Sequence, residues 1–231
     1  MDSWIQIPLT KDEVLQALQQ ALENTFIDNL RYRHPNVALD SKLRGYVGEV
    51  AFKKWLLEHG ITALESNLMN ESSAMDIDFL IHQGQEDIQL ELKTSLIPDA
   101  DETFERVAKR RDIKLIRRGS KGVEHLEGDV HVQLFYKQLR IRKDEWLKKQ
   151  NINLKSNLEK LYDKLAAFRY EKDTYLAAWI DKKTLIKQIN EKPPHLQLWK
   201  YGQRKFWCCN IYRDAKKPVS LINFLKGKQT K

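Results

Sequence analysis

The stretch that decides the fold is Asp76-Ile77-Asp78-Phe79-Leu80-Ile81, followed after a short turn by Ile88-Gln89-Leu90-Glu91-Leu92-Lys93. Apolar and polar residues alternate in both halves, which is the period of β-strands whose two faces differ. The intervening His82-Gln83-Gly84-Gln85 contains a glycine suited to a turn. We therefore predict a β-hairpin, in which Glu91 and Lys93 share one face.

The turn of this hairpin would bring the carboxylates of Asp78 and Glu91 close together. Two carboxylates held close repel each other unless a cation lies between them, and hard oxygen ligands suit Mg²⁺. Lys93 beside such a metal would orient an attacking hydroxide and offset phosphate charge, which suffices for metal-assisted hydrolysis of a phosphodiester. An alternative stays open, because Glu-Leu-Lys also occurs on solvent-facing strands, where cross-strand charges stabilise the sheet only slightly.

Upstream of the hairpin, a helix is predicted from about Ser41 to Glu58, after a turn at His34-Pro35-Asn36. Gly45 and Gly48 within it each cost about 1 kcal/mol of helix stability relative to alanine. We interpret them as places where another backbone or a ligand must come close to the helix surface.

Downstream of the hairpin, the basic segment from Phe104 to Gly122 is expected to begin as a helix, and Asp129 to Tyr136 is an alternating strand. This order predicts an α/β fold, a mixed β-sheet core flanked by helices, with additional C-terminal helices and strands. Residues 1–231 are expected to form one domain, with a catalytic core at about 42–136 and a recognition or dimerisation region at about 137–231. The further elements predicted in that region are a long helix or helix pair over 143–170, a strand over 174–180, a helix over 182–190, a hairpin over 196–212 and a short helix over 219–225.

The composition favours a polyanionic partner and a cytoplasmic location. Lysine and arginine exceed aspartate and glutamate by 40 to 32, which gives a net charge of +8 and favours DNA or RNA as a partner. No apolar run reaches the roughly 18 residues of a membrane span, and the amino terminus does not resemble a signal peptide. The only two cysteines, Cys208 and Cys209, are adjacent and lack the spacing of a zinc pair. We expect a reducing, cytoplasmic compartment and no membrane partner.

Basic residues crowd the segment directly after the hairpin, where phosphate contacts would supply salt-sensitive affinity for nucleic acid. A solvated helix face is the alternative interpretation. No zinc spacing among the histidines and no glycine motif for a nucleotide cofactor is present. The expected nucleic-acid-binding residues are Arg106, Lys109, Arg110, Arg111, Lys114, Arg117, Arg118 and Lys121.

Three motifs together resemble the PD-(D/E)XK nuclease superfamily, which has the restriction-endonuclease-like fold. They are Gly48-Glu49 on a helix, Asp78-Phe79-Leu80-Ile81 on one strand and Leu90-Glu91-Leu92-Lys93-Thr94-Ser95 on the next. The resemblance covers roughly Lys42 to Tyr136. Many members carry a proline before the aspartate, where this chain has Ala74-Met75, so Asp76 also remains a candidate for the catalytic aspartate. We favour Asp78, because the apolar run after it resembles the buried strand of the family.

By this resemblance, Asp78 and Glu91 are expected to bind Mg²⁺, with Mn²⁺ able to substitute and the carbonyl of Leu92 assisting. Lys93 is expected to position the attacking water. Glu49 is expected to reach a metal-bound water or a second metal. For Glu49 the alternative is a surface residue paired with Lys53, four positions further along the helix.

Asp129, His131 and Gln133 share one face of the following predicted strand. A glutamine on the strand after the core helix recurs in several members of the superfamily, so Gln133 is a further site candidate by resemblance. His131 is interpreted as a hydrogen-bonded histidine at the edge of the sheet.

The function expected from these features is a Mg²⁺-dependent endonuclease acting on DNA, most like a type II restriction endonuclease and active as a homodimer. The resemblance implies a 5′-phosphate and a 3′-hydroxyl as products. Two alternatives stay open. One is a repair, recombination or mobile-element nuclease of the same fold that recognises DNA structure, and the other is a nucleic-acid-binding module without catalysis.

Overall fold

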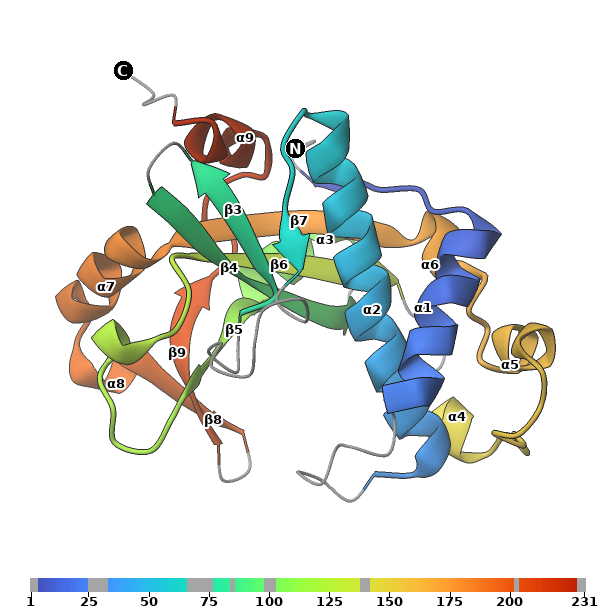
Figure 1. Ribbon diagram of the computed structural model, residues 1–231. Helices are drawn as coiled ribbons and strands as arrows, with labels where there is room; N and C mark the ends of the chain where they lie inside the picture. Colours follow the sequence, from blue (N-terminus) through green and yellow to red (C-terminus); the bar gives the residue numbers. More distant parts are fainter. Residues whose placement is uncertain are drawn as a thin grey trace.

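The computed structural model describes residues 4–24, 33–65, 77–83, 86–97, 103–137, 142–201 and 204–227. Its centre is a six-stranded mixed sheet (Figure 1), in which β4 and β6 are parallel and the other neighbouring strands are antiparallel. This confirms the predicted α/β fold with a mixed sheet. The strand order is β1 (Ile5–Gln6), β7 (Thr174–Asp181), β6 (Val130–Lys137), β4 (Glu86–Ile97), β3 (Phe79–Gln83), β2 (Leu64–Glu65).

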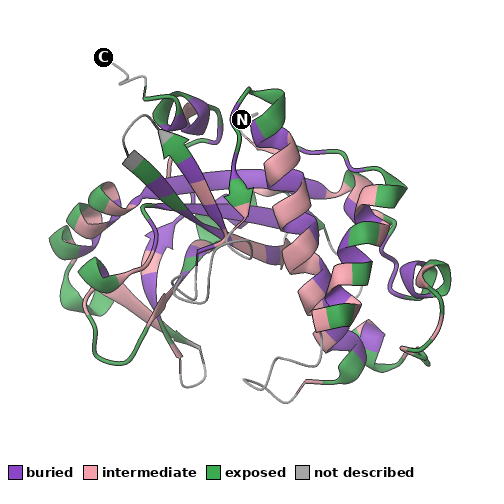
Figure 2. Ribbon diagram, in the orientation of Figure 1, coloured by how far each residue is buried: buried purple, intermediate pink, exposed green. Residues whose placement is uncertain are grey.

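The predicted hairpin is confirmed, since β3 and β4 are paired with Phe79 opposite Leu90. Both side chains are fully buried, because the apolar face of the hairpin packs under a helix. The sheet is buried most deeply at β6 and β7, which Figure 2 shows as purple along nearly their whole length. β7 comes from the C-terminal part of the chain and supplies one of the two neighbours of β6.

Two long helices, α1 (Lys11–Asn24) and α2 (Pro35–Glu58), cover one face of the sheet (Figure 1). The helix predicted from Ser41 instead begins at Pro35, so the predicted turn at 34–36 is wrong. Proline is well suited to the first turn of a helix, where its missing N–H needs no partner. His34 completes this start, because its Nδ1 accepts a hydrogen bond from the N–H of Asn36 at 3.3 Å.

Gly48 marks the closest approach of α2 to the sheet. A Cβ placed on it would lie 2.5 Å from Cγ2 of Thr94 and 2.9 Å from the hydroxyl of Tyr136. At Gly45, one turn earlier, a Cβ would meet nothing within 4 Å. The expectation of a close contact is therefore confirmed at Gly48, while nothing crowds the position of Gly45.

The opposite face of the six-stranded sheet carries a second hydrophobic core and a small antiparallel sheet in the order β5-β9-β8. The basic segment begins as a helix, as predicted, and then continues as a strand that was not predicted. Isoleucine and leucine at alternate positions bury one side of that strand. The elements of this layer are α3 (Phe104–Arg110), β5 (Asp112–Arg117), η3 (Val123–His125), α7 (Lys182–Glu191), α8 (Pro194–Gln197), β8 (Leu198–Tyr201) and β9 (Arg204–Asn210).

The helix or helix pair predicted over 143–170 is instead three short helices, α4 (Lys143–Lys148), α5 (Leu158–Lys164) and α6 (Arg169–Lys172). The chain continues through β7 and ends its described part with α9 (Val219–Leu225), as predicted. Within the described part of the chain, no helix has the length and apolar character needed to cross a membrane.

Candidate active site

Asp78 lies directly before β3, at the end of the hairpin opposite its turn. Its N–H donates to the carbonyl of Leu90 at 2.9 Å, which keeps the residue in register with β4. Its Oδ2 accepts the N–H of Leu92 at 2.5 Å. The carboxylate thus takes a hydrogen bond that a main-chain carbonyl would accept in a longer strand. This bond fixes Asp78 against the segment Glu91-Leu92-Lys93, whereas Asp76 lies outside the described residues.

Glu91 is a buried carboxylate with two basic partners. Oε1 forms an ion pair with Nζ of Lys93, and Oε2 lies 2.7 Å from Nδ1 of His131. Only 5% of Glu91 is exposed, and a charge with so little water around it is stable only when hydrogen-bonded and paired. The structure supplies both conditions. The interpretation of Glu91 and Lys93 as surface charges on a solvent-facing strand is therefore wrong.

His131 is fully buried and lies opposite Glu91 in the parallel pairing of β4 with β6. The expected hydrogen bond is present, but the expected edge position is wrong, because β6 has β4 on one side and β7 on the other. Nε2 of His131 is buried and has no hydrogen-bond partner among the described residues. An unsatisfied buried polar atom of this kind costs about 1–3 kcal/mol.

Glu49 approaches from α2 and is partly buried. Burial raises the pKa of its carboxyl to about 7, and the negative charges of Asp78 and Glu65 add to that rise. The proposed surface partner Lys53 instead binds Glu65, with Nζ and Oε1 2.5 Å apart. The negative charges of Glu49 and Asp78 thus repel each other at the end of the hairpin. A cation bound there would reduce this repulsion.

The two parts of the site come from opposite sides of β4. Leu90 and Leu92 belong to the core under α2, so Glu91 and Lys93, which alternate with them, point to the other face. Asp78 links both parts. It interacts electrostatically with Glu49 on the helical side and hydrogen-bonds the main chain of Leu92, between Glu91 and Lys93.

Gln133 and Asp129 support the main chain of β4. Gln133 is fully buried, and its Nε2 donates to the carbonyl of Lys93 at 3.0 Å. Asp129 holds Gln89 twice, through its N–H to the carbonyl at 2.7 Å and through Oδ2 from the N–H at 2.9 Å. Both residues position the strand that carries Glu91 and Lys93.

Asp78 and Glu91 are the carboxylates of this site that could serve as ligands of a Mg²⁺ ion. Within the described ranges, no three His, Cys, Asp or Glu side chains converge so as to hold a metal by themselves. Mg²⁺ commonly uses one or two carboxylates and completes its shell with waters and phosphate oxygens, and Asp78 and Glu91 supply two carboxylates. Each carboxylate has about four lone-pair positions, so the hydrogen bonds described above do not use all of them.

The basic residues predicted to bind nucleic acid are divided among a helix, a strand and a loop, so a single solvated helix face is wrong. Lys109 pairs with Glu105 at 2.6 Å and lies over the ring of Tyr212. Arg117 turns its guanidinium back onto the protein, donating to the carbonyls of Ser120 and Lys121. The remaining members, Arg106, Arg110, Arg111, Lys114, Arg118 and Lys121, are exposed.

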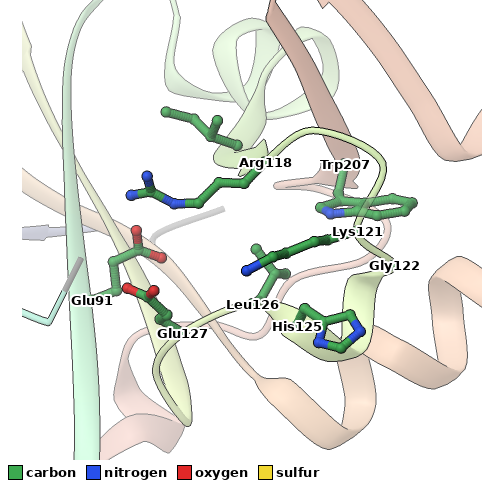
Figure 3. A pocket seen from close by; sticks show the side chains of 9 residues that line it. Glu91, Arg118, Lys121, Gly122, His125, Leu126, Glu127 and Trp207 are labelled. Atoms are coloured by element: carbon green, nitrogen blue, oxygen red, sulfur yellow. The ribbon is translucent and has the colours of Figure 1, made fainter. Parts of the chain in front are cut away.

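A pocket beside Glu91 was not predicted from the sequence. It is lined by Arg118, Lys121, Glu127 and Trp207, among others. Figure 3 shows the side chains of Arg118 and Lys121 extending from one loop toward Glu91. Phe206 and Trp207, both on β9, are buried.

A buried polar cluster also escaped prediction. Lys143 is 2% exposed, and its Nζ lies 2.8 Å from both Oδ1 of Asp40 and the hydroxyl of Tyr170. Arg44 pairs with Oδ2 of Asp40 at 3.1 Å. Charged residues are seldom fully buried, and no local pattern announces such a cluster. It joins α2, the helix of Glu49, to α4 and α6.

No protein-family model, no curated protein and no solved structure matches this chain.

Proposed function

We propose that this protein is a Mg²⁺-dependent deoxyribonuclease that hydrolyses phosphodiester bonds in DNA, most like a type II restriction endonuclease of the PD-(D/E)XK superfamily. The observation that carries the proposal is the hydrogen bond from the N–H of Leu92 to Oδ2 of Asp78. It holds one carboxylate against the strand segment that presents Glu91 and Lys93. An aspartate, a glutamate and a lysine in this arrangement suit metal-assisted phosphodiester hydrolysis.

In this proposal each side chain has a separate role. Asp78 and Glu91 would hold the Mg²⁺, with the main chain of Leu92 beside them, and the ion would supply Lewis-acid activation of the phosphate. Lys93 offsets the negative charge of the phosphate and orients the attacking water. Glu49 can take up a proton near neutral pH, because its pKa of about 7 lies in that range.

His131 acts through Glu91. Its Nδ1 and the ammonium of Lys93 engage different oxygens of that carboxylate, which limits its rotation. A ligand held in place before the metal arrives loses less freedom on binding. His131 is therefore a positioning residue rather than a catalytic one.

The proposal includes DNA as the partner, a homodimer and a cytoplasmic location. Two copies related by a two-fold axis would place one site on each DNA strand. Light scattering of the purified protein tests whether it is a dimer. The net charge of +8 favours a polyanion. Both cysteines are free thiols, as is usual in a reducing compartment.

The test is incubation of the purified protein with plasmid DNA and Mg²⁺, followed by mapping of the ends. We expect cleavage that leaves 5′-phosphates and stops in EDTA. Asp78→Asn, Glu91→Gln and Lys93→Met should each lower the cleavage rate at least 100-fold. Asp87→Asn is the matched control, because Asp87 is an exposed acid on the same hairpin.

The products separate the remaining possibilities. Discrete plasmid fragments support a restriction enzyme, whereas cutting confined to branched or nicked DNA supports a nuclease that recognises structure. DNA binding without any cleavage under these conditions, or full activity in the Asp78 and Glu91 variants, would refute the proposed reaction.

A further inference from the structure

Arg117 holds the loop between β5 and η3 by hydrogen bonds to its main chain. Its Nε donates to the carbonyl of Lys121 at 2.9 Å, and its Nη2 donates to the carbonyl of Ser120 at 2.8 Å. The same guanidinium lies over the ring of Trp207, 5.3 Å from the centroid. Gly119 has a φ of 59°, which glycine adopts without strain. Arg117 thus ties the loop both to itself and to Trp207.

This loop forms one wall of the pocket beside Glu91. Arg118 and Lys121 come from the loop, Glu127 comes from the segment after η3, and Trp207 comes from β9. In Figure 3 the guanidinium of Arg118 and the ammonium of Lys121 both point inward, toward the carboxylate of Glu91. The pocket thus opens directly next to the candidate active site.

The charges of the pocket favour an anion with several oxygen atoms. Arg118 and Lys121 carry two positive charges. The carboxylate of Glu127 offsets one of these positive charges, while the carboxylate of Glu91 is already paired with Lys93. An arginine has five N–H donors in a planar fork, so Arg118 can serve a carboxylate and a phosphate at the same time.

We propose that this pocket binds a phosphate group of the nucleic acid, adjacent to the phosphodiester that lies at Asp78, Glu91 and Lys93. The inference rests on the proposed function, because it places the bound phosphate next to the scissile bond. The pocket sets where the substrate strand lies along β4. Of the basic residues between Phe104 and Gly122, the proposal assigns this phosphate contact to two, Arg118 and Lys121.

The test measures binding without catalysis. Fluorescence anisotropy in EDTA follows the binding of a labelled DNA duplex by wild-type protein, by Arg118→Ala/Lys121→Ala and by Lys183→Ala/Lys187→Ala. The last pair removes the same charge from exposed positions on α7. Thermal melting checks that the variants fold, which we expect because Arg118 and Lys121 are exposed.

The pocket variant should bind about 10- to 100-fold more weakly than wild type, and its salt dependence should fall by about one phosphate contact. The α7 control should stay within about threefold of wild type. An equal loss in both variants would mean that only overall charge matters, and it would overturn the proposal. Failure of the wild-type protein to bind the duplex would overturn it as well.

The form of the phosphate is decided with duplexes that end in either a 5′-phosphate or a 5′-hydroxyl. A loss in the pocket variant with both duplexes assigns the pocket to an internal phosphodiester, whereas a loss with the phosphorylated end alone assigns it to a terminal phosphate. Cleavage with Mg²⁺ is assayed separately. If wild type cleaves no DNA while the pocket variant still binds DNA more weakly, the proposed reaction is wrong but the proposal of a phosphate-binding pocket is supported.

Discussion

Replacing Gly48 by alanine should destabilise the protein, although the same change at Gly45 should stabilise it. Both glycines lie inside α2, where alanine is favoured over glycine by about 1 kcal/mol. At Gly45 nothing lies within 4 Å of the new Cβ, so this gain is realised. At Gly48 the new Cβ would lie 2.5 Å from Cγ2 of Thr94 and 2.9 Å from the hydroxyl of Tyr136.

Neither neighbour of Gly48 can move cheaply. Thr94 is a β-branched residue on β4, where it pairs with Leu134 of β6. The hydroxyl of Tyr136 donates to the carbonyl of Arg44 at 2.6 Å, and moving it breaks that bond. Overpacking costs about 1–3 kcal/mol and a lost hydrogen bond about 1 kcal/mol. After the helix gain of about 1 kcal/mol is subtracted, Gly48→Ala should lower the free energy of unfolding by about 1–3 kcal/mol.

Urea unfolding followed by circular dichroism at 222 nm measures both variants against wild type. The Gly45 and Gly48 variants should differ by about 2–4 kcal/mol in the free energy of unfolding. Adding Thr94→Ser to Gly48→Ala removes the closest methyl group and should restore part of the loss. A Gly48→Ala protein as stable as Gly45→Ala, or no rescue by the serine, would show that α2 does not contact the sheet there.

Two further changes test the electrostatics of the interior. Glu49→Gln should leave the free energy of unfolding unchanged near pH 4 and raise it by about 1–3 kcal/mol at pH 8, measured in EDTA. In the folded wild-type protein the pKa of Glu49 is raised to about 7. Wild type therefore loses stability as the pH rises from about 4.5 through 7, whereas the glutamine variant does not. A constant difference between Glu49→Gln and wild type across this range would contradict that pKa. Lys143→Met should cost about 3 kcal/mol in urea unfolding, because it leaves the fully buried Asp40 with less compensating charge. The control Lys148→Met, at an exposed position of the same helix, should change little, and equal effects at both sites would count against a buried ion pair.

The hairpin and its charged face could be predicted because strand periodicity is a local property of the sequence. Phe79, Leu90 and Leu92 are buried as their alternation indicates. The start of α2 was missed because Pro35 was interpreted as a turn residue, although proline also fits the first turn of a helix. β5 was not predicted because its segment was interpreted by its basic residues. The alternation of Ile113 and Leu115 with polar residues was a usable strand signal.

The partners across the sheet could not be predicted. The bond between Glu91 and His131 depends on the parallel register of β4 with β6, which no local pattern specifies. The same holds for Lys143 and Asp40, which meet only after α4 packs against α2. The pocket of Arg118 and Lys121 depends on where β9 places Trp207. Sequence periodicity indicates which face a residue occupies, but contacts between distant segments decide what that residue meets.

The position of β7 has a consequence for how the protein is made. The strand that carries His131 gains its second neighbour only from residues 174–181, which leave the ribosome well after the hairpin. Until then the far edge of β6 offers unpaired N–H and carbonyl groups, which invite association with other chains. A nascent chain therefore cannot complete the sheet around Glu91 until most of its length has emerged, and a gene truncated before Thr174 should yield aggregates rather than a smaller folded protein.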